Sequence, residues 1–283
     1  MPTPTTRADP DAETSVSAVD AGKEPIEITL RDGRLTLPVP PGYCAVTRDT
    51  PDLAASFLAV EAAFGKATCL LGWFVDCRTL AAVRDGGAPV SSLFGGYGVY
   101  VSPISETGEL QHLPGLTRAE FVERISGTLP SFDREVLSVT IGKSQPIDDG
   151  DGAIRLATRE IGLLGADAQA YYLATAAELT LDGERRALAG VAATTLLHRV
   201  TVSTIVYGGL EDNGTLAALE RQAHAATLAL IAANPGGDDG GRGFSPDADR
   251  LLLIGLGIGL AFVATGRVNL AWQWWCRRKG LQP

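Results

Sequence analysis

The sequence contains few residues of the types that perform nucleophilic or metal chemistry. The cysteines are Cys44, Cys69, Cys77 and Cys276, and the histidines are His112, His198 and His224. No two cysteines have C-x-x-C spacing, and no cysteine stands at zinc-ligand spacing from a histidine. A structural zinc site needs such a set of four ligands. We therefore predict a protein that holds neither a metal nor a cofactor.

A nucleophile paired with a histidine base would indicate a hydrolase. His198 could serve as that base for Cys44, Cys69 or a serine, but nothing in the spacing brings these residues together. A histidine beside a turn is more often a polar edge residue. His224 follows Glu220 and Arg221 on the polar side of a predicted helix, where we expect exposure to solvent. An envelope hydrolase is therefore kept as an alternative, and we expect no catalytic site.

Two cysteines fall at the ends of predicted elements. Cys44 comes just after a predicted hairpin, and Cys77 ends an apolar run. Their Cα atoms could therefore come within disulfide distance. A disulfide between them would indicate an oxidising compartment, and reduced, packed thiols are the alternative. Cys69 lies inside the apolar run, where a buried free thiol is expected.

Two further sequence motifs do not match the known motifs that they resemble. Gly142-Lys143-Ser144 resembles the end of a P-loop, but position 137 is leucine where the motif needs glycine. The aspartates at 148, 149 and 151 resemble part of a calcium loop, but position 159 is arginine where a bidentate glutamate is needed. We interpret the second motif as an acidic turn.

Charge and hydropathy limit the possible partners. The net charge is -9, the sequence pI is about 4.9, and 45% of the residues are hydrophobic. An acidic chain lacks the basic stripe that nucleic-acid binding requires, so we expect no nucleic-acid partner. The hydrophobic fraction is sufficient for a substantial core.

Composition divides the chain into five segments. Residues 1–24 are polar and aperiodic and should be disordered. Residues 25–235 should form one soluble domain, followed by a Gly- and Asp-rich flexible linker over 236–248. A transmembrane helix is expected over 249–275, and a basic tail over 276–283.

Hydrophobic periodicity predicts the elements of the domain. A hairpin is expected at 26–39 around Asp32-Gly33, with strands at 67–75, 95–101, 154–164 and 170–181. The segment 187–207 should form either two strands with a turn near His198 or one long bent strand. One helix is expected after a Thr50 N-cap, with an apolar stripe at Leu53, Phe57, Val60 and Phe64. Another is expected after a capping box at Thr117, and a third over 131–144, although 136–141 could instead be extended. The last helix is expected over 216–230, with a stripe at Leu216, Leu219, Ala223, Ala226 and Leu230. This order indicates an α+β fold with a mostly antiparallel central sheet and helices on its faces, an α/β/α sandwich.

The same element order, with a last helix that ends in Ala233-Asn234-Pro235, resembles the Mog1 and PsbP-like group. The resemblance covers residues 26–234 and rests on no diagnostic motif. Members of that group serve as binding or accessory proteins more often than as enzymes. The resemblance therefore implies a binding role.

The proposed membrane helix contains sixteen uncharged residues, 251–266, where about 20 residues span a bilayer. The span reaches a suitable length if it continues to Trp275 with Arg267 snorkelling. The residues expected at the membrane interface are Arg267, Trp272, Trp274, Trp275, Arg277, Arg278 and Lys279. A buried C-terminal helix of the domain is the alternative. Gly255 and Gly259 form a G-x-x-x-G motif that could support a homodimer.

The basic tail should remain in the cytoplasm, which would place the domain in the periplasm. That orientation needs an export signal upstream of Met1, because residues 1–24 do not resemble one. A tail-anchored structural subunit on the cytoplasmic face is the alternative. We therefore expect a membrane-tethered, non-catalytic binding or accessory module of the bacterial cell envelope, with an unidentified protein partner.

Overall fold

The computed structural model describes residues 24–30, 33–50, 52–64, 67–105, 108–113, 115–132, 154–181, 184–209 and 213–236. The predicted helix at 131–144 falls largely outside these ranges. The linker, the membrane helix at 249–275 with Gly255 and Gly259, the interface residues and the basic tail lie outside them entirely. Among the described helices, none is long and apolar enough to cross a membrane.

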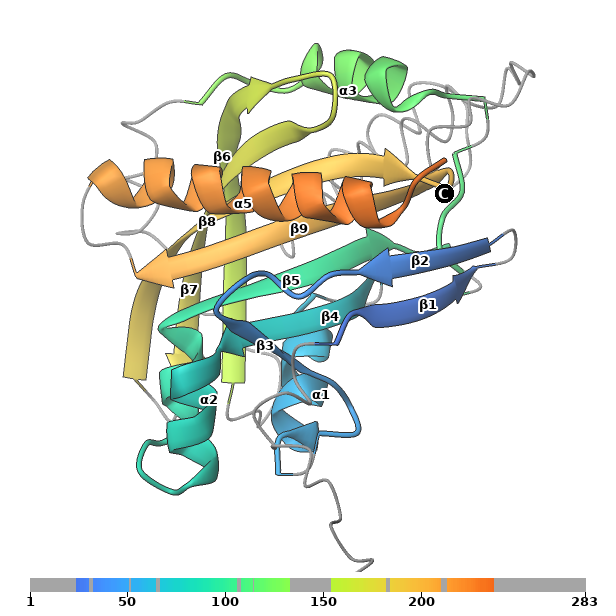
Figure 1. Cartoon of the computed structure of the whole chain (residues 1–283). Helices are drawn as coiled ribbons and strands as arrows, with labels where there is room; N and C mark the ends of the chain where they lie inside the picture. Colours follow the sequence, from blue (N-terminus) through green and yellow to red (C-terminus); the bar gives the residue numbers. More distant parts are fainter. Residues whose placement is uncertain are drawn as a thin grey trace, which may run out of the picture.

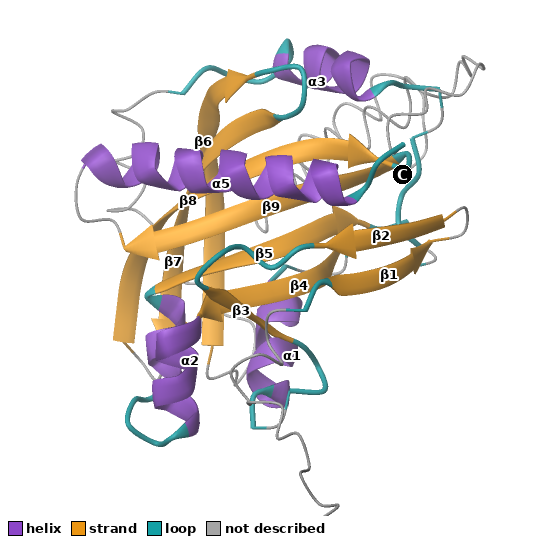
Figure 2. Ribbon diagram, in the orientation of Figure 1, coloured by secondary structure: helices purple, strands orange, loops and turns teal. Residues whose placement is uncertain are grey.

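A seven-stranded antiparallel sheet forms the centre of the fold (Figures 1 and 2), so the predicted α+β class is confirmed. Its strand order is β3-β4-β5-β9-β8-β7-β6, and every neighbouring pair is antiparallel. The strands are β3 (Tyr43–Val46), β4 (Thr68–Asp76), β5 (Gly96–Pro103), β6 (Ile154–Ala166), β7 (Tyr171–Leu181), β8 (Glu184–Leu197) and β9 (Val200–Gly209).

Within the described part of the chain, one face of the sheet packs against three α-helices and a short 3-10 helix. These are α1 (Ala54–Ala63), α2 (Cys77–Arg84), η1 (Val90–Phe94) and α3 (Arg118–Ser126). Their apolar side chains share one core with Trp73, Tyr97 and Tyr207 of the sheet. Thr117 caps α3 in the predicted capping box, in which its hydroxyl accepts from the Glu120 amide and the Glu120 carboxylate accepts from the Thr117 amide.

The start of α1 was predicted wrongly. The Thr50 hydroxyl accepts a hydrogen bond from the Thr47 amide at 2.8 Å, which closes a turn before the helix begins. Asp52 has a φ of 65°, and Leu53 occupies the N-cap position without a side-chain bond. The turn therefore uses the oxygen that would have capped the helix. The predicted apolar stripe is nonetheless buried at Leu53, Phe57, Val60 and Phe64.

The opposite face carries helix α5 (Asn213–Ala233) and a separate hairpin of β1 (Ile26–Leu30) and β2 (Gly33–Leu37). The predicted helical stripe is buried at Leu216, Leu219, Ala223, Ala226 and Leu230. Leu35 and Leu37 of the hairpin pack with Phe74 and Tyr100 of the sheet. Pro38 ends β2, because proline cannot donate to a strand ladder.

Asn234 fastens the hairpin to α5. Its side-chain oxygen accepts from the Thr36 amide, and its Nδ2 donates to the Thr36 carbonyl, each at 2.8 Å. The same Nδ2 donates to the Leu230 carbonyl at the end of the helix. Asn234 is buried. Its hydrogen bonds connect two segments that are almost two hundred residues apart in the chain.

Candidate ligand-binding groove

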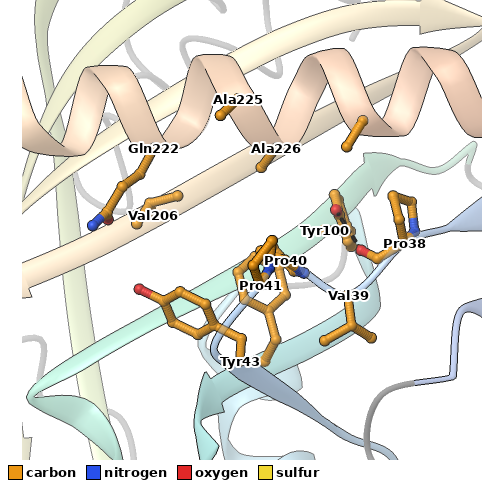
Figure 3. A pocket seen from close by; sticks show the side chains of 12 residues that line it. Pro38, Val39, Pro40, Pro41, Tyr43, Tyr100, Val206, Gln222, Ala225 and Ala226 are labelled. Carbon is orange, nitrogen blue, oxygen red and sulfur yellow. Dashed lines mark hydrogen bonds between the residues drawn. The ribbon is translucent and has the colours of Figure 1, made fainter.

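A groove of about 330 Å³ lies between α5 and the segment that connects β2 to β3 (Figure 3). Pro38, Val39, Pro40, Pro41 and Tyr43 form one wall. Gln222, Ala225, Ala226 and Ala229 of α5 form the other wall, and Phe74, Tyr100 and Val206 form the floor. Three segments that are distant in the sequence therefore build one concave surface.

Local sequence explains why this space stays open. The lining positions on α5 are spaced three and four residues apart, so they share one side of the helix, and three of them are alanines. Prolines hold the opposite wall extended, because their φ is fixed. On the floor, the Phe74 ring lies 5.4 Å from the Tyr43 ring and 5.3 Å from the Tyr100 ring, measured between centroids. Gly98 accommodates Phe74, since a Cβ there would lie 2.0 Å from its Cε2.

None of the twelve lining residues is charged. The Tyr100 hydroxyl donates to the Pro38 carbonyl at 2.8 Å, and the Tyr43 amide donates to the Pro40 carbonyl at 3.0 Å. Burial raises the pKa of both tyrosine hydroxyls, and Asp76 adds to the effect at Tyr43. Both rings therefore remain neutral at physiological pH. The Gln222 amide is the most polar side chain along the helical wall.

A disulfide joins Cys44 and Cys77 behind this wall, with their Cα atoms 5.0 Å apart. Cys44 adjoins Tyr43 on β3, and Cys77 begins α2. The Cys77 amide also donates to the Gly42 carbonyl at 3.1 Å. The covalent bond therefore fixes the end of the segment that forms the wall. It also removes Cys44 from the hydrolase hypothesis, because a disulfide sulfur is not a thiolate nucleophile.

The fold does not bring Cys69 and His198 together, although this was the other cysteine–histidine pair considered for a hydrolase. Cys69 lies on β4, whereas His198 lies in the turn between β8 and β9, and β5 separates β4 from β9. Two strand spacings amount to about 10 Å. Burial, followed by the nearby Glu61, raises the pKa of Cys69, so its thiol stays protonated. His198 has a φ of 47° and Arg199 one of 64°, which makes the pair a tight hairpin turn, as predicted near His198.

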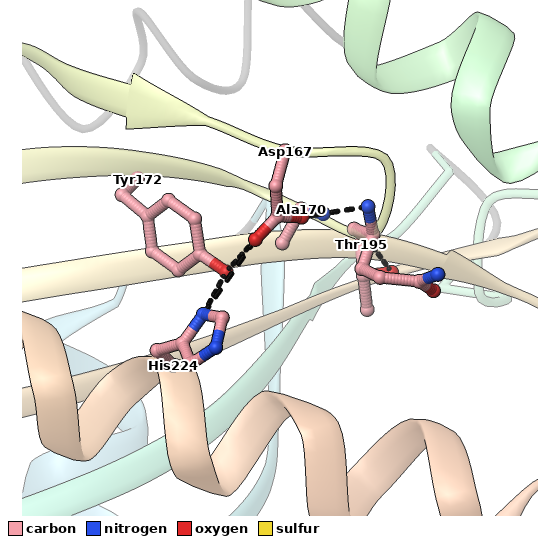
Figure 4. Close-up of polar contacts among 6 residues, drawn as sticks. Asp167, Ala170, Tyr172, Thr195 and His224 are labelled. Atoms are coloured by element: carbon pink, nitrogen blue, oxygen red, sulfur yellow. Dashed lines mark hydrogen bonds and ion pairs between the residues drawn. The ribbon is translucent and has the colours of Figure 1, made fainter.

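A polar cluster links α5 to the turn between β6 and β7 (Figure 4). The Tyr172 hydroxyl lies 2.9 Å from Asp167 Oδ2 and 2.7 Å from His224 Nδ1. A carboxylate only accepts and the hydroxyl has one hydrogen, so Tyr172 donates to Asp167 and His224 Nδ1–H donates to Tyr172. The side chain of His224 is 46% exposed, and it also makes this contact, which the prediction of exposure to solvent did not include.

The pKa shifts in this cluster do not favour a nucleophile or a general base. Burial alone would raise the pKa of Asp167, but hydrogen bonds from the Gln169 and Ala170 amides and from Tyr172 outweigh burial and lower it. Burial and Asp167 raise the pKa of Tyr172, which is the opposite of what a nucleophile or base needs. Asp167 and Tyr172 therefore hold each other in their ordinary protonation states.

Within the described ranges, no group of three or more metal-binding side chains gathers. His112 forms an isolated β-bridge with Val200. Comparison of the chain with protein-family models, with curated proteins and with solved structures found no match. The resemblance to the Mog1 and PsbP-like group stays a prediction, and the function has to be argued from the groove itself.

Proposed function

We propose that this protein is a non-catalytic binding or accessory module of the bacterial cell envelope. In this proposal residues 249–275 tether it to the membrane, and the folded part lies on the periplasmic side. The observation that carries the proposal is the uncharged groove between α5 and Pro38–Pro41. A concave apolar surface with few polar groups is the usual form of a small-ligand site.

The polar side chains of the groove support binding more than catalysis. An enzyme needs a nucleophile, acid or base positioned at the reacting atom. The groove contains two neutral tyrosines and one amide, and the Tyr100 hydroxyl is already bonded to Pro38. Cys69 and His198 are absent from its lining. The resemblance to a group of mostly accessory proteins agrees with this interpretation.

Two observations support the periplasmic location. The Cys44–Cys77 disulfide favours an oxidising compartment, because cytoplasmic thiols are kept reduced. The basic residues Arg277, Arg278 and Lys279 favour a cytoplasmic C-terminus, which would leave the domain outside. A Gly255–Gly259 contact between two such helices would give a homodimer.

Export can be tested with alkaline phosphatase fused after Asn234 and expressed with the native upstream DNA. The phosphatase needs its own disulfides and is active only outside the cytoplasm. We expect activity, and we expect β-galactosidase fused at the same residue to be inactive. Full-length phosphatase fusion without activity, together with active β-galactosidase, would remove the periplasmic location from the proposal.

A further inference from the structure

We infer that the groove binds a single unbranched hydrocarbon chain, that of a fatty acid or a similar single-chain amphiphile. This inference deepens the proposed binding function and rests on it.

The walls offer almost nothing to a polar ligand. Three of the four residues from Pro38 to Pro41 have no amide hydrogen, and the carbonyls of Pro38 and Pro40 already accept from Tyr100 and Tyr43. The helical backbone of α5 is used by its own hydrogen bonds. A peptide, sugar or nucleotide would therefore bury polar groups without partners, which is costly. A hydrocarbon chain brings no such groups.

The dimensions suit one chain. About 330 Å³ lies at the small end of the range for ligand pockets. The helical wall from Gln222 to Ala229 is roughly 10 Å long at 1.5 Å per residue. Alanine methyl groups line one side and proline rings the other, with aromatic rings beneath (Figure 3). Such a slot accommodates part of a flexible chain more readily than a two-chain lipid.

The open end of the groove can accommodate the polar head group of such a ligand. Gln222 is exposed at one end of the helical wall, where its amide can donate to a head group that stays in water. The chain length should then set affinity. Each methylene that fits inside the groove should strengthen binding about fourfold, until the groove is full.

The test is photolabelling of the full-length chain in phosphatidylcholine nanodiscs with palmitic acid that carries a diazirine in mid-chain. After irradiation, reduction and trypsin digestion, one tryptic peptide, residues 35–48, contains the whole proline wall. Another, residues 222–242, contains the whole helical wall. We expect adducts in both peptides, competition by unlabelled palmitate, and weaker competition by fatty acids too short to fill the groove.

Ala226→Phe should fill the groove and abolish these adducts. Leu228→Phe is the control, because Leu228 is 42% exposed and is not part of the lining. Ala229 is exposed and lines the groove, so Ala229→Phe gives a second blocking variant if Ala226→Phe does not fold. Adducts that survive a folded blocking variant, adducts confined to other peptides, or no adducts at all would overturn the inference.

Co-elution with the nanodiscs, read from the same sample, reports on the tether separately. A chain that elutes apart from the nanodiscs contradicts the membrane tether. If unlabelled palmitate still competes away the adducts in residues 35–48 and 222–242 of that chain, the inferred ligand of the groove is still supported. A chain that co-elutes but is labelled only outside residues 35–48 and 222–242 would contradict the ligand and leave the tether standing.

Discussion

Removal of the Cys44–Cys77 disulfide should destabilise the domain by several kcal/mol. Both cysteines are replaced in the double variant Cys44→Ser with Cys77→Ser, so that no unpaired partner thiol remains. The two cysteines are 33 residues apart in the chain. For a closed loop of that length, the chain-entropy model gives about 3.7 kcal/mol at 25 °C. Cys44 is also buried, so the serine adds a burial cost of about 1 kcal/mol.

The assay is pulse proteolysis of the full-length chain across a urea series. A domain of this size loses about 2 to 3 kcal/mol of stability per molar urea, so the midpoint should fall by about 1.5 to 2.5 M. Adding a reductant to the wild type should produce most of the same fall. The double variant should not respond to the reductant.

Cys69→Ser is the matched control. Cys69 is a free thiol on β4, so this variant should keep the full response to reductant. A wild-type urea midpoint that does not move when the disulfide is reduced would contradict the predicted loss of stability. It would mean that the bond does not constrain the unfolded chain by the amount that the loop length implies.

The other predictions concern contacts elsewhere in the fold, each read from unfolding midpoints. Asn234→Ala removes three hydrogen bonds and should cost about 2 to 3 kcal/mol, with faster amide exchange in the β1–β2 hairpin. Gly98→Val should cost about 2 kcal/mol or more, because its Cβ would collide with the Phe74 ring. Thr204→Val should be neutral or stabilising by up to about 1 kcal/mol, because the buried Thr204 hydroxyl has no partner among the described residues. Asp167→Asn should destabilise at pH 7. The folded-state pKa of Asp167 is lowered, so its contribution is present above its ordinary value of about 3.9 and is lost as the pH falls further. The difference in stability between the wild type and Asp167→Asn should therefore shrink as the pH falls below that ordinary value.

Local signals predicted much of the fold. The stripe on α5 was visible because Leu216, Leu219, Ala223, Ala226 and Leu230 recur with helical spacing, and all five are buried. The capping box at Thr117 depends on residues three positions apart, so it too could be identified from the sequence. The start of α1 was missed for a local reason, because the same Thr50 oxygen serves either a cap or a turn.

The groove could not be predicted in this way. The predicted hairpin ended at residue 39, within the proline wall, and Ala225 and Ala229 gave no signal on a helix rich in alanine. What creates the site is that Pro38–Pro41 and α5 lie side by side, although they are far apart in the chain. The bond between Tyr172 and His224 likewise joins residues 52 positions apart. Alanine spacing and prolines are compatible with many arrangements, so only the folded structure selects this one.

We propose that residues 249–275 hold this domain at a membrane. The most direct measurement is the partition of the full-length chain between supernatant and pellet, after cell membranes are washed with alkaline carbonate and centrifuged without detergent. A chain ending at Gly236 serves as the control. We predict that the full-length chain stays in the pellet and that the shortened chain moves to the supernatant. Full-length chain in the supernatant would contradict the account.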